Sequence, residues 1–112
     1  MAYEWGDIVW ARLPFTDQLG ERERPVLVVS TQRRNRGRDV TVAQLSSQVG
    51  KARRRGDYVL RRWAEASLDR PAALRPKIMV ILKGRVTGRI GRLHEDDASG
   101  VKAFLMEIFG CD

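Results

Sequence analysis

Hydrophobic and polar residues alternate along two segments in the first half of the chain. In residues 6–13 the side chains of Val9, Ala11 and Leu13 fall on one face, and residues 39–45 repeat the same two-residue period. A period of two is typical of β-strands, whose successive side chains point to opposite faces of a sheet. We therefore predict a strand in each segment.

A continuously apolar run stands between those two segments. Residues 25–30, PVLVVS, are rich in valine, as expected for a central strand that is buried on both faces. Proline has no N–H group to donate to a neighbouring strand. We therefore expect Pro25 to be the first residue of this strand.

The second half of the chain carries shorter patterns. Residues 57–61 predict a short strand and residues 61–68 a turn of helix, and two prolines then bracket residues 71–76. Residues 78–82 are apolar throughout, which fits either a strand or a buried turn of helix. Residues 83–93 have the composition of a strand but contain three glycines, a pattern that indicates bulges or sharp curvature of a sheet.

One segment has the period of an amphipathic helix. Residues 95–109 begin with three acidic residues, which the helix dipole favours, and Gly110 is in place to cap the C-terminal end. Gly100 inside this segment costs about 1 kcal/mol relative to alanine. The apolar positions recur at spacings of three and four: Ala98, Val101, Leu105 and Ile108.

These elements predict an α+β fold in one domain spanning residues 1–112. The strands would form a small, strongly bent, mostly antiparallel sheet of the SH3-like barrel type, with the C-terminal helix packed against it. A chain of 112 residues is long enough for one modest core.

The charge balance narrows the class of partner. Lysine and arginine number 21 against 14 acidic residues, a formal charge of +7, which favours a polyanionic partner: a nucleic acid, an acidic membrane surface or an acidic protein. One cysteine and one histidine exclude a disulfide within the chain and a zinc site of the usual closed kind. No apolar run approaches the ~20 residues of a membrane helix. We expect a protein of the cytoplasm with no membrane partner.

The connection between the first two predicted strands is too long for a simple hairpin. It begins at Pro14, is filled with charged residues, and ends at Arg24. Hairpin loops usually have two to five residues, whereas long loops on compact domains often carry function. This connection is therefore a candidate part of a site.

Three stretches form motifs in a fixed order along the chain: GDIVWARLPFTD…RERPVLVVS, LSSQ (45–48) and LRPKIMVILKGRVTGRIGRLHEDD (74–97). The first resembles the opening of the PemK/MazF toxins of bacterial toxin–antitoxin systems, and the second resembles the hydroxyl-bearing segment that ends their third strand. The third is similar to the C-terminal half of the PemK-like branch, and the whole match spans nearly all of the chain.

The resemblance implies a homodimeric, sequence-specific endoribonuclease that cleaves single-stranded RNA, including mRNA, without a metal or any other cofactor. Cleavage of mRNA would inhibit translation and growth. The expected products carry a 2′,3′-cyclic phosphate and a 5′-hydroxyl, because the 2′-hydroxyl of the substrate is the nucleophile. An antitoxin with an acidic C-terminal segment would cover the RNA groove.

The catalytic residues implied by the resemblance are Arg24, Ser46 and Arg75. A guanidinium fork fits phosphate oxygens, and a hydroxyl can donate to one of them, so these groups can stabilise the charge that builds on the phosphorane. Lys77 stands where PemK-type members carry an aspartate, so the resemblance assigns no general base. Glu21 and Glu23 are nearby carboxylates with no assigned role.

Further residues are predicted to bind the RNA. Thr16 and Asp17 belong to the first-loop motif, or else order that loop through local hydrogen bonds. Ser47 is an alternative source of the catalytic hydroxyl. The remaining candidates are polar or basic residues near the motifs and in two basic loops: Gln48, Lys77, Arg33, Arg34, Arg53 and Arg54.

Two other functions stay open at this point. A small basic SH3-like barrel can bind nucleic acid without cutting it, and the lysine at position 77 is consistent with such a module. Toxins directed at gyrase share the barrel, although the C-terminal sequence EIFGCD does not show their pattern.

Overall fold

The structure is a computed structural model that describes residues 2–14 and 21–111. The order of elements in the described residues is β1 (Asp7–Pro14), β2 (Glu21–Val28), η1 (Arg34–Arg36), β3 (Asp39–Ser46), α1 (Val49–Arg55), β4 (Tyr58–Val59), β5 (Ala73–Leu82), η2 (Lys83–Arg85), β6 (Val86–Arg92) and α2 (Glu95–Ile108). The predicted α+β class is confirmed.

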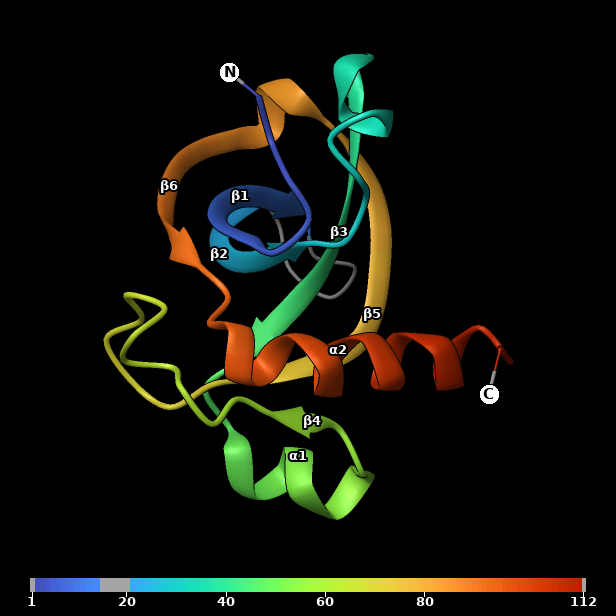
Figure 1. Cartoon of the computed structure of the whole chain (residues 1–112). Coiled ribbons are helices and arrows are strands. Elements are labelled where there is room, and N and C mark those ends of the chain that lie inside the picture. Colours follow the sequence, from blue (N-terminus) through green and yellow to red (C-terminus); the bar gives the residue numbers. More distant parts are fainter. Residues whose placement is uncertain (1, 15–20, 112) are drawn as a thin grey trace.

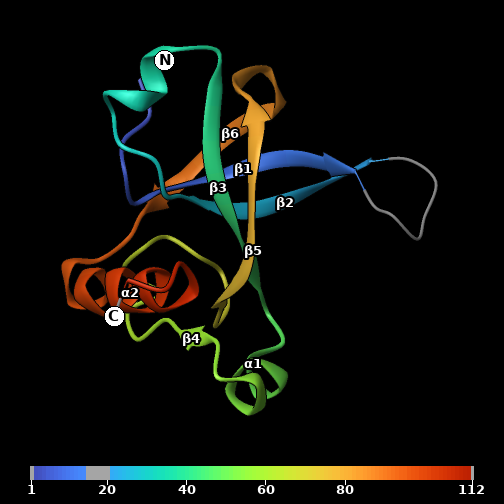
Figure 2. The ribbon, with the colours of Figure 1, turned by 90° about the vertical axis from the view of Figure 1, so that its right-hand side faces the viewer.

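All strands belong to one six-stranded sheet with the order β4-β5-β3-β2-β1-β6. Every neighbouring pair is antiparallel. The sheet is strongly bent, as Figure 1 shows, with α2 lying across one side of it (Figure 2). In the described part of the chain the two end strands, β4 and β6, do not pair with each other, so the sheet does not close into a barrel.

The bent sheet is apolar on both faces, because alternate residues of its strands enter two different cores. Val9 and Val26 belong to a cluster with the other inner valines, whereas Ile8 and Leu27 belong to a second cluster that includes Val101 and Leu105 of α2. At the centre of the sheet the period of two in the sequence therefore separates two buried sets. Further along β1 it separates buried from exposed residues, since Ala11 and Leu13 are buried and Trp10 and Arg12 are exposed.

Two expectations about prolines are wrong. β2 begins at Glu21, so Pro25 lies inside the strand. It is tolerated because β3 pairs with β2 only from Val26 onward, which leaves one edge of β2 open before that residue. Pro76 likewise lies inside β5, at the irregularity in the β3–β5 pairing between Ala43 and Leu45.

The segments around β4 match the prediction only in part. Residues 61–68 form hydrogen-bonded turns, one of which has the helical pattern from the N–H of Ala66 to the carbonyl of Arg62, as predicted, but β4 has only two residues. The basic segment after β3, predicted as a loop, contains the seven-residue helix α1. Gly56 ends α1 in the left-handed conformation, with φ at 79°, and the three arginines of its last turn suit the negative end of the helix dipole.

A buried carboxylate fixes β4 and the following turn to α2. Asp97 is fully buried and accepts hydrogen bonds from the Tyr58 hydroxyl (2.7 Å) and from the backbone N–H groups of Arg61 and Arg62 (2.9 Å each). Burial, followed by the hydrogen bond donated to Asp97, raises the pKa of Tyr58 to about 12. We call this group of residues the Asp97 anchor.

Gly100 has a packing role within this anchor. A Cβ atom at this position would collide with the ring of Tyr58. The glycine therefore costs helix propensity in α2 but allows the tyrosine to reach Asp97. From the sequence alone, only the loss of helix propensity at Gly100 could be predicted, and not its contact with Tyr58.

Candidate nucleic-acid interface

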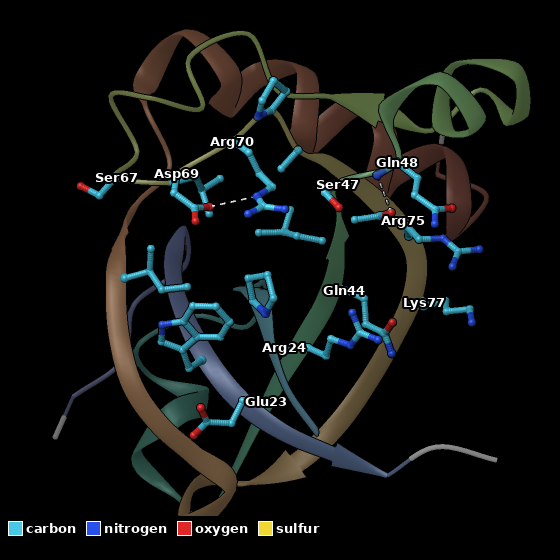
Figure 3. A pocket seen from close by; sticks show the side chains of 18 residues that line it. Glu23, Arg24, Gln44, Ser47, Gln48, Ser67, Asp69, Arg70, Arg75 and Lys77 are labelled. Carbon is cyan, nitrogen blue, oxygen red and sulfur yellow. Dashed lines mark hydrogen bonds and ion pairs between the residues drawn. The ribbon is translucent and has the colours of Figure 1, made fainter. Parts of the chain in front are cut away.

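A groove with a volume of about 720 Å³ crosses one face of the sheet (Figure 3). Its lining comes from β1, β2, the end of β3, β5, β6 and the turn at residues 67–72. Most of these segments are far apart in sequence and are brought together by the bending of the sheet. Arg24, Ser46 and Arg75, predicted as catalytic residues, all line this groove, as do Ser47, Gln48 and Lys77, predicted to bind RNA.

Arg24 is presented by a strand whose outer edge is open. It lies opposite Ala11 of β1, two residues before Val26, at which β3 begins to pair with β2. Its side chain is exposed, and Figure 3 shows it beside Gln44. Pro25 restricts the backbone immediately after it, so the guanidinium projects from a fixed position.

The end of β3 presents two hydroxyl groups to the groove. Ser46 is half-buried, and its Oγ accepts a hydrogen bond from the backbone N–H of Gln48 at 3.1 Å. This turn uses one acceptor lone pair of the hydroxyl, so its O–H group can still donate to a ligand. Ser47 is exposed and also lines the groove.

Arg75 lines the groove, and the buried carboxylate of Asp57 lies next to its side chain. Its Nε atom is buried and has no hydrogen-bond partner among the described residues, and it lies 4.0 Å from Oδ2 of Asp57. The Asp57 side chain is only 4% exposed and also pairs with Arg55 at 3.1 Å. One carboxylate therefore faces two guanidinium groups, which leaves this corner of the groove positive.

The cationic side of the groove is continued by Lys77, two residues after Arg75 on β5. Figure 3 shows Arg24, Arg75 and Lys77 on the same side of the groove. On the other side, the Nε atom of Arg70 lies 3.5 Å from Oδ1 of Asp69, and both side chains are exposed. Glu23 and Asp69 bring two carboxylates to the lining.

The turn at residues 67–72 forms a wall that the sequence did not predict. Ser67 has a φ angle of 71°, a conformation that favours glycine, and it lies at the groove. The turn sits tightly on β6, because a Cβ atom at Gly91 would collide with the backbone carbonyl of Ala66. Gly91 therefore allows the backbone of this wall to lie directly against the sheet.

Four predicted RNA-binding arginines lie outside the groove. Arg53 and Arg54 are exposed in the last turn of α1, which follows directly after Gln48. Arg33 and Arg34 lie at η1, at the opposite end of the sheet from α1 (Figures 1 and 2). Thr16 and Asp17 are outside the described residues.

His94 is a helix cap in the structure. Its Nδ1 atom accepts a hydrogen bond from the backbone N–H of Asp96 at 3.0 Å, at the start of α2. In the described part of the chain, no three of the histidine, cysteine and acidic side chains gather closely enough to hold a metal ion. Neither of the helices α1 and α2 described here is long and apolar enough to cross a membrane.

Comparison with solved structures finds the same fold in several toxins. An endoribonuclease in complex with its cognate antitoxin from a mycobacterial species is 18% identical, with a TM-score of 0.76 over 99% of this chain and 96% of that one. The Mycobacterium tuberculosis toxin MazF-mt6 is 22% identical, with a TM-score of 0.75 over 95% and 98%. A MazE–MazF structure (Form-III) from Deinococcus radiodurans is 18% identical, with a TM-score of 0.77 over the full length of both chains.

Comparison with curated proteins gives no match. The model of one family, described as the PemK-like, MazF-like toxin of type II toxin–antitoxin systems, matches residues 4–109. This match covers nearly all of the sequence and confirms the resemblance carried by its three motifs. The chain therefore belongs to the PemK-like, MazF-like family of type II toxins.

Proposed function

We propose that the protein is an endoribonuclease toxin that cleaves single-stranded RNA, including mRNA, and thereby inhibits translation and growth. The observation that carries this proposal is the convergence of Arg24, Ser46 and Arg75, from three different strands, on one groove. The family and the mycobacterial structure described as an endoribonuclease support the same activity.

The proposed reaction uses the 2′-hydroxyl of the RNA as the nucleophile. Its oxygen forms a bond to the adjacent phosphorus, the bond from phosphorus to the 5′-oxygen breaks, and that oxygen leaves as a 5′-hydroxyl after gaining a proton. The other product is a 2′,3′-cyclic phosphate. Because negative charge builds on the phosphoryl oxygens, the main task of the protein is to place positive charge and hydrogen-bond donors there.

Arg24 is proposed to stabilise this charge and to assist proton transfer to the leaving oxygen. Arg75 binds the same phosphate or its neighbour, and Ser46 donates its hydroxyl proton to a phosphoryl oxygen. Glu23 and Asp69, which line the groove, are the candidates for accepting the 2′-hydroxyl proton.

The RNA is proposed to run beyond the groove along α1. Ser47, Gln48 and Lys77 contact it within the groove. Arg53 and Arg54 extend the cationic surface past Gln48, while Arg33 and Arg34 would contact only a distant part of a bound strand. Each phosphate that is neutralised steepens the dependence of affinity on salt concentration.

We further propose an antitoxin partner, a homodimeric state and a site of action in the cytoplasm. Two of the compared structures are described as complexes of a toxin with its antitoxin. An acidic segment of an antitoxin would compete with RNA for the cationic side of the groove, because both are anions.

The proposed activity can be tested with purified protein and a long single-stranded RNA in EDTA. We expect discrete fragments that carry cyclic phosphate and 5′-hydroxyl ends. Arg24→Ala should lower the cleavage rate about 10²–10³-fold with an unchanged melting temperature, because the side chain is exposed. RNA that is bound but stays intact would instead identify the chain as a non-catalytic binding module, and full activity of the Arg24 variant would remove this residue from the mechanism.

A further inference from the structure

The two sides of the groove differ in chemistry. The side formed by β2, β3 and β5 presents the cations Arg24, Arg75 and Lys77 together with the hydroxyls of the β3 end (Figure 3). The side formed by β1, β6 and the turn at residues 67–72 presents the ion pair of Arg70 with Asp69 together with four apolar side chains: Trp10, Leu68, Pro71 and Ile90. A ligand that fills the groove therefore needs an anionic part and a flat apolar part.

Trp10 is the largest apolar side chain on this surface. It is 41% exposed, although Val9 and Ala11 on either side of it in β1 are completely buried. Removing apolar surface from water is favourable, so a ligand that covers the exposed part of the indole gains affinity.

The neighbouring strands leave the indole uncovered. Trp10 lies opposite Pro25 on β2 and opposite Gly88 on β6, two residues without long side chains. A Cβ atom at Gly88 would already lie 3.7 Å from Cδ1 of the indole, so a larger residue there would cover the ring. The pairing of β1 with β6 also shifts register between Trp10 and Ala11, and such bulges re-aim side chains beside functional sites.

We propose that this half of the groove is a nucleobase subsite in which one base of a single-stranded RNA stacks on Trp10. This inference rests on the proposed function, and it adds the position at which one base of the RNA is bound. A nucleotide carries a phosphate and an aromatic base joined through one sugar, which matches a groove with a cationic side and an aromatic side. Stacking on an aromatic side chain tolerates any base, because every base has a π-face.

Binding can be separated from cleavage with two uncleavable probes. One is a short single-stranded DNA of mixed sequence, and the other is a chain of the same length without bases. We expect Trp10→Leu to weaken binding of the DNA about tenfold and to leave binding of the abasic chain unchanged, whereas Trp10→Phe should retain most of the affinity. Trp5→Phe is the control, because Trp5 is half-buried outside the groove with Lys102 over its ring.

A second measurement follows Trp10 directly. In the Trp5→Phe/Trp63→Phe protein Trp10 is the only tryptophan, and its emission should be quenched by the DNA but not by the abasic chain. This measurement decides the question alone if the Trp10→Leu chain does not fold.

Equal quenching by both probes, or equal affinity of Trp10→Leu and the unmodified chain for the DNA, would overturn the proposal. The proposal would also be overturned if the emission of Trp10 shifted when the protein was diluted but did not change when the DNA was added. The indole would then be covered by a second copy of the chain. Failure of the nuclease proposal has a different signature, namely intact RNA in EDTA with the base-dependent quenching preserved.

Discussion

The Asp97 anchor and the groove lie at neighbouring parts of the fold but treat their polar groups in opposite ways. In the anchor, Asp97 is fully buried and receives three hydrogen bonds, and Gly100 opens the space that one of them requires. In the groove, the Nε atom of Arg75 is buried without a hydrogen-bond partner among the described residues, Ser67 adopts a left-handed backbone, and Trp10 is 41% exposed.

The difference separates groups that stabilise the fold from groups that are held ready for a ligand. A satisfied buried network contributes to folding, whereas unsatisfied or strained groups reduce stability and persist where they serve binding or catalysis. Changes in the anchor should therefore affect mainly the free energy of unfolding. Changes in the groove should affect mainly the interaction with RNA.

The largest effect is expected from Asp97→Ala. The substitution leaves the Tyr58 hydroxyl and two backbone N–H groups without their acceptor, and each charge-assisted hydrogen bond contributes about 1.5–3 kcal/mol. We expect a loss of about 3–5 kcal/mol in the free energy of unfolding, a large share of the total of about 5–15 kcal/mol. Urea titration followed by circular dichroism measures this loss.

The matched control for that prediction is Asp96→Ala. Asp96 is the preceding residue, is exposed, and pairs with Arg62 at the surface. Its removal should change the stability by less than about 1 kcal/mol. Similar losses for both aspartates would mean that the hydrogen bonds to Asp97 do not anchor the segment.

Tyr58→Phe should have a smaller effect that depends on pH. The phenol must be neutral to donate to Asp97, and its pKa is raised from 10.0 to about 12 in the folded protein. The stabilisation is therefore complete below the pKa of about 10 in the unfolded chain, and it is lost as the pH rises towards 12. At neutral pH the phenylalanine variant should be less stable by about 1.5–3 kcal/mol.

The pH dependence makes this prediction specific. Urea titrations between pH 8 and pH 12 should show that the stability difference between the two chains is constant at first and narrows above pH 10. A difference that stays constant throughout this range would contradict a role for the neutral phenol.

The smallest effect is expected from Asp57→Asn, which tests the groove. The neutral amide no longer attracts Arg75, so we expect the cleavage rate to fall about tenfold. The loss in free energy of unfolding should be smaller than for Asp97→Ala, because the side chains of Arg55 and Arg75 both keep contact with water. In an Arg75→Ala background the same substitution should cause little further loss, because the two residues act together.

Asp39→Asn is the control for charge. Asp39 is exposed at the start of β3 and lies outside the groove, and its substitution removes the same single negative charge. Equal losses of activity for the two asparagine variants would show that net charge, rather than the pairing of Asp57 with Arg75, sets the rate.

Local pattern predicted the parts of the fold that depend on neighbours in sequence. The alternation before Pro14, the valine-rich centre of β2 and the three- and four-residue spacing of α2 each correspond to an element of the structure. Helix α1 was missed because only Ala52 in it is buried, so it shows no apolar period. The cap at Gly56 was the available signal.

The site shows the same division between local and long-range information. The motifs led to Arg24, Ser46 and Arg75, and the structure places all three at the groove, although their proposed catalytic roles stay predictions. Asp57 and Trp10 could not be assigned from the sequence, because their surroundings come from β5, β2 and β6. The same holds for Asp97, whose acceptor role depends on residues more than thirty positions away.

The burial of both sheet faces has a consequence for how the strands find their alignment. In a sheet with one solvent-exposed face, shifting a strand by one residue moves its apolar side chains into solvent, so the shifted pairing is strongly disfavoured. Here a slip at the centre of β2 would exchange Val26 and Val28 for Leu27, so hydrophobicity discriminates weakly between the two alignments of that strand. A slip of β1 is opposed more strongly, because it would bring the exposed Trp10 and Arg12 towards the core. The alignment of the sheet is therefore set mainly at β1, where Gly88 of the paired strand β6 lies beside the indole of Trp10 and Gly91 of β6 lies beneath the Ala66 carbonyl.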